Sequence, residues 1–284
     1  MIKLLQIFLS FFFFLFSSFG ISQPNLILNP SFEDTVNCPN SAGQINYAKF
    51  CSNPSFASPD YFNSCTTNTT INTPNNVYGN QLPKSGNAYA GVITYLDNTS
   101  NFSEYIQCQM SSSLLPNQQY CVSFFINLAD SSSYASNDIG VFLSPTPVSY
   151  STNQSFTLTP IFANGSVNIN KINWSLISFS FTASGGELYF LIGNFKNNTA
   201  TSASPVSGAV WMNGVYFFID DISLTQGPCF TGIKENYFLE YKVYPNPSSN
   251  GKIYLSNLNT IIKKENIKIF NYLGEEQKIK ISEI

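Results

Sequence analysis

The sequence of 284 residues contains no histidine and no arginine, and all of its basic residues are lysine. Without histidine the chain lacks a Ser-His-Asp triad and the usual ligands of a zinc site. Without arginine it lacks the planar group that clamps a phosphate or carboxylate substrate with two hydrogen bonds. A glycine-rich phosphate loop is also missing, because the glycines of TASGGEL at 182–188 fit a hairpin turn. We therefore expect a protein that is not an enzyme.

One kind of catalysis stays open, glycoside hydrolysis by two carboxylates, because it requires neither histidine nor arginine. The acidic residues that could serve in it are Glu104, Asp130, Asp138 and Glu187. Nothing in their spacing pairs any two of them. A glycosidase is therefore the less favoured alternative to a binding protein.

Charged residues are scarce, at 10% of the chain, and the net charge changes sign along it. Residues 25–230 hold ten acidic residues and four lysines, a net charge of −6, whereas residues 232–284 hold six acidic residues and eight lysines, a net charge of +2. Together with the turn-rich TQGPCFTG at 225–232, this change marks a domain boundary near residue 230. The acidic main domain argues against a nucleic-acid partner, since such binding depends on lysine and arginine.

The longest apolar run lies near the N-terminus. Lys3 precedes a mostly apolar stretch at 4–19, which is followed by the small residues Gly20 and Ser22. This order is typical of a secretory signal peptide, which we assign to residues 1–22. A transmembrane anchor is the alternative, but the run is shorter than the roughly 20 residues of a membrane span. We expect the remaining chain to be secreted or attached to the outer cell surface, without spanning the membrane after signal cleavage.

Short runs of alternating apolar and polar residues follow one another through residues 23–230. CVSFFINLAD at 121–130, ISFSFTA at 177–183 and ELYFLIGNF at 187–195 repeat with period two, which indicates β-strands. The abundance of Asn, Ser, Thr, Gly and Pro disfavours helices. We predict an all-β fold in which residues 23–230 form an antiparallel jelly-roll β-sandwich.

Two long segments, roughly 38–85 and 145–170, fit no strand pattern. Loops of this length are usually functional or disordered, and the first contains three cysteines that would tie it down. The first segment is therefore a candidate binding surface. After a linker at 231–241, residues 242–284 contain further alternating runs around the turn NYLGEE, which predict a small C-terminal β module.

The first domain contains six cysteines, which are Cys38, Cys51, Cys65, Cys108, Cys121 and Cys229. An even number in an exported chain predicts disulfides, and the lack of histidine and of a CxxC motif disfavours a metal site. Cys108 and Cys121 flank the turn LLPNQQ between two expected neighbouring strands, so we expect them to pair. Cys38 with Cys65 is the second expected pair, which leaves Cys51 and Cys229.

The tail resembles a known family. VYPNPSSNGKIYL at 243–255 and IKIFNYLGEEQK at 267–278 are similar to the C-terminal sorting domain of the type IX secretion system of Bacteroidetes-type bacteria. The resemblance implies a cargo signal that is recognised by outer-membrane secretion machinery and is often removed on release or surface attachment. The family usually closes with a further strand pair that carries a Gly-Val/Ile-Tyr step, and this pair is missing before Ile284. We therefore expect a partial sorting domain at 242–284.

The main domain resembles the jelly-roll carbohydrate-binding modules of galactose-binding-like fold. Its opening LNPSFED at 28–34 and its closing FFIDDISL at 217–224 match the N-G/P-S/D-F-E and Y-I-D-D-V steps of those modules. It is similar as well to a group of exported Bacteroidetes domains through four motifs: SPDYFNSC (58–65), SGNAYAGV (85–92), EYIQ (104–107) and LIGNF (191–195). The resemblance implies a sugar-binding role.

In those modules, acidic residues of the opening and closing motifs hold a structural calcium ion, and the resemblance assigns Ca2+ to Glu33 with Asp220 or Asp221. Calcium prefers several oxygen ligands, carboxylates among them. Alternation along the last strand predicts Asp220 on the face of Ile222 and Asp221 on the face of Ile219, so that either carboxylate has apolar neighbours. A buried charge needs a partner or a metal. The alternative is that these acids accept hydrogen bonds from backbone N–H groups or from water.

A sugar site requires aromatic faces that stack on pyranose rings and polar groups that bind hydroxyls. Trp211 lies in an expected loop between two glycines and is the better surface candidate, whereas Trp174 begins an apolar strand and is favoured as a core residue. The remaining candidates come from the cysteine-rich segment: Tyr61, Phe62, Tyr78 and Asn76, with Asn63 and Gln81 nearby. For Tyr61 and Phe62, packing at the sandwich edge is the alternative.

These observations favour a secreted or cell-surface binding protein whose partner is an extracellular glycan or a surface protein. Carbohydrate is the favoured ligand, and exposed aromatic rings are the expected sign of it. The alternative is an adhesion or structural domain without a sugar site, which would present a broad face of Asn, Ser and Thr.

Overall fold

The computed structural model describes residues 23–98, 100–208, 211–229, 242–244, 252, 254–256 and 275–276. The chain divides into two compact units, 1–229 and 230–284. The predicted signal peptide at 1–22 and the predicted linker at 231–241 lie outside the described residues, as does most of the predicted sorting domain at 242–284.

The described part of the first unit consists of β-strands and one short 3-10 helix. In chain order the elements are η1 (Ile45–Tyr47), β1 (Cys51–Ser52), β2 (Asp60–Asn63), β3 (Asn75–Asn76), β4 (Gly79–Asn80), β5 (Ala88–Leu96), β6 (Tyr105–Gln109), β7 (Gln119–Leu128), β8 (Tyr134–Ser136), β9 (Gly140–Ser144), β10 (Phe162–Ala163), β11 (Ser175–Thr182), β12 (Tyr189–Gly193), β13 (Ala203–Pro205) and β14 (Gly214–Gln226). Within the described ranges, no helix is long and apolar enough to cross a membrane.

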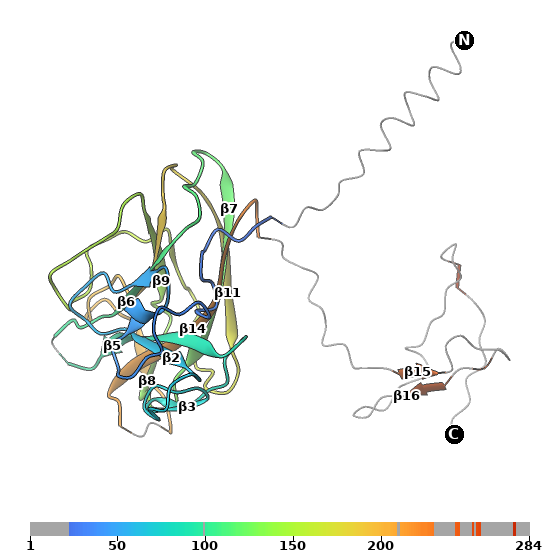
Figure 1. Cartoon of the computed structure of the whole chain (residues 1–284), viewed down its shortest axis with the longest axis horizontal. Helices are drawn as coiled ribbons and strands as arrows, with labels where there is room; N and C mark the ends of the chain where they lie inside the picture. Colours follow the sequence, from blue (N-terminus) through green and yellow to red (C-terminus); the bar gives the residue numbers. More distant parts are fainter. Residues whose placement is uncertain are drawn as a thin grey trace, which may run out of the picture. The chain divides into compact units, whose positions relative to one another are not determined.

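Two five-stranded antiparallel sheets form the body of this unit (Figure 1). The first sheet has the order β1-β6-β12-β9-β10, and the second has the order β11-β7-β14-β5-β2. β14 is the last strand of the unit in sequence, yet it lies in the middle of the second sheet, paired with β7 on one side and β5 on the other. The predicted all-β, antiparallel jelly-roll sandwich is confirmed.

The main core lies between the two sheets and follows from the alternation seen in the sequence. Along β7, the inward-facing Val122, Phe124 and Ile126 have no exposed surface. They meet apolar residues of the first sheet, among them Phe190 and Ile192 of β12, in one hydrophobic cluster. A period of two places every second side chain of a strand on the same face, which is why these runs predicted strands.

The outer faces of both sheets are also covered in part, and the two long segments without a strand pattern provide the cover. Phe156, from the segment 145–170, packs on Tyr105 of β6 and Leu191 of β12. Ile71 and Tyr78, from the segment 38–85, pack on the outer face of the second sheet. Segments that bury apolar side chains in this way are ordered parts of the fold, not open loops.

A bulge in β14 changes the expected placement of its two aspartates. The pairing with β7 shifts between Asp220 and Ser223, and Asp221 has a positive φ of 49°. The extra residue brings Ile219 and Ile222 into the same core cluster, because an inserted residue shifts the alternation by one. The prediction that Asp220 shares a face with Ile222, and Asp221 with Ile219, was therefore wrong.

Three disulfides link the six cysteines, and two of them differ from the expected pairs. Cys38–Cys65 is confirmed. The pairing of Cys108 with Cys121 was wrong, because β6 and β7 belong to different sheets and are not neighbours. Cys108 is bonded to Cys51, which lies directly opposite it on β1, and Cys121 is bonded to Cys229 beyond the end of β14. The expected remainder, Cys51 with Cys229, was therefore wrong as well.

The described part of the second unit contains one antiparallel pair, β15 (Lys242–Tyr244) with β16 (Tyr254–Ser256). Val243 is opposite Leu255, and Tyr244 is opposite Tyr254. These strands carry the start of the motif that resembles a sorting domain. Most of the rest of the motif lies outside the described residues.

Candidate functional site

The outer face of the second sheet carries an aromatic cluster under the β3–β4 hairpin. Phe62, Tyr89, Tyr216 and Phe218 project from three neighbouring strands and have at most 1% of their surface exposed. Their rings contact one another at centroid distances between 4.9 and 6.5 Å. Such contacts bury apolar surface and favour particular ring orientations, which holds the rings in place. The cluster is therefore a rigid base for the β3–β4 hairpin.

Two of the predicted ligand contacts are inside this base or below it. Phe62 is part of the cluster and has no exposed surface. Tyr61 points to the opposite face, into the main core, and its hydroxyl donates a hydrogen bond to the carbonyl oxygen of Phe32 (2.8 Å). Because neither side chain reaches the surface, we remove Tyr61 and Phe62 from the proposed ligand set. Their strand, β2, was hidden in the sequence by its short length.

Both tryptophans hold the hairpin in place through their indole N–H groups. Trp211 Nε1 donates to the carbonyl oxygen of Val77 (3.1 Å), and Trp174 Nε1 donates to that of Leu82 (2.9 Å). Trp174 is half-buried and packs against the ring of Tyr89, which agrees with the structural role favoured for it. The polar edge of each ring is thereby satisfied within the protein.

Trp211 ends a column of aromatic rings. Its ring lies 5.4 Å from that of Tyr78 at an angle of 34°, and Tyr78 stacks on the buried Tyr216 at 3.7 Å and 20°. The side chain of Trp211 is nevertheless 55% exposed. An aromatic ring that is fixed at one edge and open on its surface suits stacking on the apolar face of a ligand. Of the predicted aromatic contacts, Trp211 and its neighbour Tyr78 are the two that come together.

The amide side chains of this region have two different roles. Asn76 donates to the hydroxyl of Tyr89 (2.8 Å) and accepts from the backbone N–H of Tyr78 (2.9 Å), so it holds the hairpin. Asn75 and Asn80 face each other across the hairpin, are exposed, and share one hydrogen bond of 2.6 Å. Sequence reasoning missed this second pair, although the Gly79-containing turn between two Asn-rich runs is a hairpin signal.

The remaining two polar candidates are buried. Asn63 donates to the hydroxyl of Tyr61 (2.7 Å), and Gln81 donates to the carbonyl oxygen of Leu82 (3.0 Å). Both are less than one-tenth exposed. They stabilise the loop and the sheet from inside, and no ligand hydroxyl reaches them in this arrangement.

A pair of carboxyl groups is buried beside the aromatic cluster. Asp60 accepts hydrogen bonds from the backbone N–H of Gly43 and the hydroxyl of Tyr216, both at 2.6 Å. Glu104 accepts from the backbone N–H groups of Ser58 (3.1 Å) and Ile93 (2.8 Å). Burial, and for Glu104 the nearby negative charge of Asp60, raise the pKa of both carboxyl groups. With only 2% and 1% of their surface exposed, they do not present a pair of carboxylates to a substrate.

The other acids considered for glycoside hydrolysis hold parts of the fold together. Asp130 accepts from the backbone N–H of Asn80 (2.9 Å), and Glu187 accepts from two backbone N–H groups of its own turn. Asp138 forms an ion pair with Lys196 at 2.6 Å. Each carboxylate thus has a structural partner within the fold.

Each of the three acids assigned to calcium accepts hydrogen bonds from the same loop, residues 84–88. Glu33 accepts from the backbone N–H groups of Asn87 (2.8 Å) and Ala88 (2.9 Å). Asp220 accepts from those of Lys84 (2.8 Å), Ser85 (3.3 Å) and Asp221 (2.7 Å), and Asp221 accepts from the Ser85 hydroxyl (2.6 Å). The loop passes so close that a Cβ on Gly86 would lie 2.3 Å from the Glu33 carboxyl carbon.

This arrangement uses the carboxylates to accept N–H and O–H donors. Among the described residues, no three Asp, Glu, His or Cys side chains converge as a metal site requires. Burial and the neighbouring charge of Asp221 raise the pKa of Asp220 to about 8. The contacts match the alternative in which the acids bond to the backbone, and we derive no function from a bound ion. Calcium binding stays a prediction from the resemblance.

No family model matches the chain, and no curated protein matches its sequence. Solved structures with a similar arrangement include the CBM22-1 xylan-binding domain from Paenibacillus barcinonensis, at 9% identity over 72% of this chain and 97% of that domain, with a TM-score of 0.38. They also include the K1 cleaved adhesin domain of Lys-gingipain from Porphyromonas gingivalis, at 12% identity, 69% and 96% coverage and a TM-score of 0.34. A CBM61 module in complex with β-1,4-galactotriose matches at 12% identity, 72% and 99% coverage and a TM-score of 0.30. The proposals below rest on the chain's own residues.

Proposed function

We propose that residues 23–229 form an exported, non-catalytic binding domain for neutral carbohydrate, and that a sugar ring stacks on Trp211. The observation on which this rests is the exposed indole of Trp211, which is fixed by its bond to Val77 and by its stack on Tyr78. A fixed ring loses little conformational entropy when a ligand binds, which favours affinity. The exposed amides of Asn75 and Asn80 lie on the β3–β4 hairpin that carries Val77, and they supply groups that can bind sugar hydroxyls.

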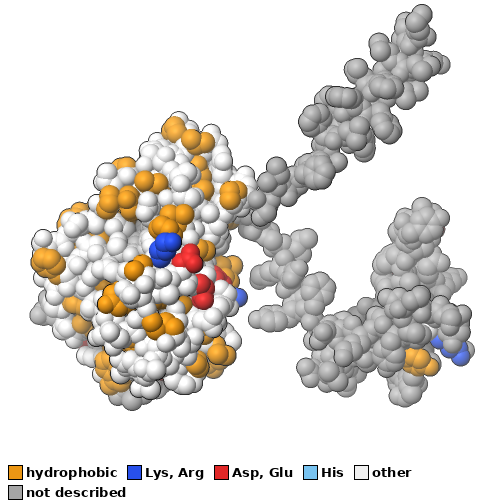
Figure 2. All heavy atoms as spheres, viewed as in Figure 1, with side chains coloured by type: hydrophobic (Ala, Val, Ile, Leu, Met, Phe, Trp, Pro, Cys, Tyr) orange, Lys and Arg blue, Asp and Glu red, His pale blue; other side chains and the backbone are white. Residues whose placement is uncertain are grey.

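Charged residues make up 10% of the chain, which agrees with a neutral ligand. Figure 2 shows one face, on which most side chains are uncharged and the few acidic and basic ones lie close together. One carboxylate lies at the hairpin itself, where Asp130 accepts from the backbone N–H of Asn80 (2.9 Å). A charged ligand would need a complementary ionic group to offset its desolvation. Hydroxyl, amide and aromatic groups, by contrast, are what a sugar requires.

Three disulfides within one domain support export, because disulfides form and persist mainly in oxidising compartments. The proposed route is type IX secretion, with the tail at 242–284 as the cargo signal. This route is supported by the residues of the motif alone. The signal peptide at 1–22 remains part of the proposal.

The first prediction concerns Trp211. Replacing it with alanine removes the stacking surface, so we expect glycan binding to weaken at least tenfold, while Trp211→Phe retains part of it. The measurement is a glycan array with the oxidised protein, followed by titration calorimetry on any sugar that binds. Leu115→Ala is a matched control, because Leu115 is also an apolar side chain with 55% exposure.

Two outcomes would contradict the proposal. One is a folded wild-type protein that binds no glycan on the array. The other is binding that Trp211→Ala leaves unchanged. A loss of binding in Leu115→Ala equal to that in Trp211→Ala would show that exposed apolar area, and not the indole, is responsible.

One observation favours the alternative, an adhesion domain without a sugar site. The outer face of the second sheet continues beyond the aromatic cluster as rows of small polar side chains across β11, β7 and β14. Ser178, Ser123 and Ser223 form one row by their register. A polar row of this kind is one part of the broad Asn, Ser and Thr face that the adhesion hypothesis predicts, and a negative glycan array would make adhesion the leading function.

A further inference from the structure

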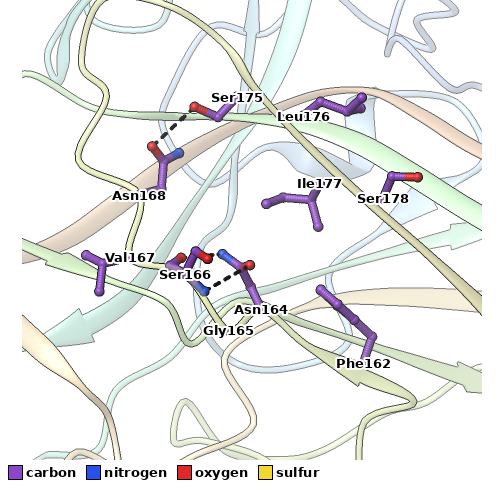
Figure 3. Close-up of a pocket in the computed structure, with 10 residues that line it drawn as sticks. All are labelled: Phe162, Asn164, Gly165, Ser166, Val167, Asn168, Ser175, Leu176, Ile177 and Ser178. Atoms are coloured by element: carbon purple, nitrogen blue, oxygen red, sulfur yellow. Dashed lines mark hydrogen bonds between the residues drawn. The ribbon is translucent and has the colours of Figure 1, made fainter. Parts of the chain in front are cut away.

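The loop 164–168 follows β10 and forms one wall of a pocket where the edges of the two sheets meet (Figure 3). β10 is the edge strand of the first sheet and β11 is the edge strand of the second. The ring of Phe162 on β10 stacks on that of Phe179 on β11, at 3.9 Å and 3°, and joins the two edges. None of the residues that line the pocket is charged. A charge introduced into this loop would therefore change the chemical character of the pocket.

The loop begins with the dipeptide Asn164-Gly165. An asparagine that precedes a glycine is open to attack by the next backbone nitrogen, because glycine has no side chain to prevent the close approach. The sequence contains two further Asn-Gly steps, Asn213-Gly214 and Asn250-Gly251. The last of these lies outside the described residues. The two described steps differ in how the structure holds them.

The side chain of Asn164 is folded back along the chain. Its Nδ2 donates to the carbonyl oxygen of Ser166 (2.7 Å), and its Oδ1 accepts a long hydrogen bond from the backbone N–H of Ser166 (3.4 Å). Figure 3 shows both bonds, which draw the amide across the intervening Gly165. A donor at Oδ1 stabilises the negative charge that develops on this oxygen when a nucleophile adds to the amide carbon. The side chain is thus positioned for attack by the Gly165 nitrogen.

The Gly165 nitrogen is free to make that attack. Its N–H donates to no group among the described residues. Gly165 is exposed, and a Cβ built on it would meet no atom within 4 Å. Its carbonyl oxygen accepts one long bond of 3.4 Å, from Asn137. Little packing therefore resists the backbone rotation that closes a ring.

At Asn213-Gly214 the corresponding nitrogen is held. Asn213 is exposed, but the N–H of Gly214 donates to the carbonyl oxygen of Met212 (3.0 Å). Gly214 is the first residue of β14 and is paired with Leu96. A Cβ on Gly214 would lie 2.3 Å from the carbonyl oxygen of Tyr95, so its backbone is closely packed. Ring closure at this step would have to break the end of a central strand.

We infer that Asn164 is a site of spontaneous covalent modification, at which its amide becomes a carboxyl group. The Gly165 nitrogen loses its proton and attacks Cγ of Asn164. A C–N bond forms, the bond from Cγ to Nδ2 breaks, and Nδ2 leaves as ammonia. Water then opens the resulting succinimide ring at one of its two carbonyl groups and leaves aspartate or isoaspartate at position 164. Because both reacting groups belong to one short segment, the first step needs no second molecule, and geometry controls its rate.

Either product adds a negative charge to a pocket whose lining has none. An aspartate at this position also cannot donate to the carbonyl oxygen of Ser166, as Asn164 does. Isoaspartate inserts an extra backbone atom directly after β10, whose residues Phe162 and Ala163 pair with β9. The reaction does not reverse, so the modified form accumulates with the age of each molecule. This inference does not depend on the proposed sugar site.

The test incubates the full chain, with its disulfides intact, at pH 8 and 37 °C for several weeks. Chymotrypsin cuts after aromatic residues and places the two steps in separate peptides, 163–174 and 212–216. Tandem mass spectrometry then locates the gain in mass that results from exchange of NH2 for OH. We expect modification of Asn164 to be at least tenfold faster than that of Asn213 in the folded protein. In the reduced chain in concentrated urea, we expect the two rates to be similar.

Two variants test the route. Gly165→Ala adds a Cβ in open space, so we expect the fold to be kept and the modification of Asn164 to slow at least tenfold. Val167→Ala is the control, because it trims an exposed side chain of the same loop and leaves the Asn-Gly step intact. We expect it to react at the wild-type rate.

Three results would overturn the inference. The first is an equal rate at Asn164 and Asn213 in the folded protein. The second is an Asn164 that stays unmodified in the folded protein while the unfolded chain reacts. The third is an unchanged rate in Gly165→Ala, which would exclude attack by the Gly165 nitrogen. None of these results alters the test of glycan binding at Trp211, so the two proposals stand or fall separately.

Discussion

Asp60 and Glu104 place two carboxyl groups in the interior without a lysine to balance them. Lys196 forms an ion pair with Asp138, and neither buried acid takes part in it. Burial raises the pKa of Asp60, and burial together with the charge of Asp60 raises that of Glu104. These acids therefore hold protons in the folded protein at a pH at which the unfolded chain releases them.

The sign of the resulting pH dependence follows from proton linkage. A folded state that binds more protons than the unfolded state loses stability as the pH rises. We expect the midpoint of thermal unfolding to fall between pH 6 and pH 8.5, by several degrees for each ~1–2 kcal/mol of lost stability. Differential scanning calorimetry in buffers of matched ionic strength measures this directly.

The variant Asp60→Asn distinguishes the contribution of the buried pair to the pH dependence from that of other titrating groups. The asparagine can still accept from Gly43 and can donate to the Tyr216 hydroxyl, so the fold should be kept. With one charge removed, the pKa of Glu104 moves back toward its usual value, and the fall in melting temperature between pH 6 and 8.5 becomes smaller. An unchanged pH dependence in this variant would show that the pair does not cause it.

At the level of strands, the disulfides differ in how much of the chain they enclose. Cys121–Cys229 spans 108 residues and ties the end of the domain to β7, whereas Cys38–Cys65 spans 27 residues. A cross-link restricts the unfolded chain more when it closes a longer loop. The chain-entropy relation gives a difference of about 1 kcal/mol between loops of these lengths.

We therefore expect Cys121→Ala/Cys229→Ala to lower the free energy of unfolding by about 1 kcal/mol more than Cys38→Ala/Cys65→Ala does. Urea titration of the oxidised proteins, followed by intrinsic fluorescence, provides the comparison. Equal losses in the two double variants, or a greater loss for the shorter loop, would show that native contacts and not loop length decide the contribution.

Strand positions could be predicted from the sequence where an element is long enough to show its period. β7 and β11 alternate over at least eight residues each and were found. β2 has four residues, all buried, and shows no alternation because both of its faces are covered. The bulge at Asp221 was invisible for a related reason, since one inserted residue leaves no mark in composition.

The candidate sites could be predicted only in part, because the burial of a side chain depends on how distant segments pack together. Trp211 was found because flanking glycines indicated a loop, and it is exposed. Tyr61 and Phe62 looked equally suitable, but burial depends on which segments cover a sheet face. The pocket lined by Asn164 and Gly165 arises where β10 and β11, far apart in the chain, meet at the sheet edges. Pairings of that kind, and the disulfide partners, are properties of topology.

For the whole domain, the acids at its two ends raise the question of calcium. Glu33 and Asp220 already accept backbone N–H groups of the loop 84–88. From these contacts we expect EDTA to leave the melting temperature unchanged. We expect Glu33→Ala to lower the free energy of unfolding by about 1–2 kcal/mol, because both hydrogen bonds accepted by Glu33 Oε1 are lost. A melting temperature that rises on addition of calcium, in the wild type but not in Glu33→Gln, which keeps the acceptor oxygen but removes the charge, would instead establish the ion predicted by the resemblance.

The central position of β14 has a consequence for the proposed export of this chain. The second sheet cannot close until residues 214–226 are present, because β7 and β5 meet only through that strand. The N-terminal segment also depends on this strand, because the backbone N–H of Leu26 donates to the carbonyl oxygen of Leu224. A chain that is translocated from its N-terminus therefore remains incompletely folded until nearly the whole domain has crossed. On the proposed export route, this late completion of the fold would keep the chain unfolded while it passes through a membrane channel.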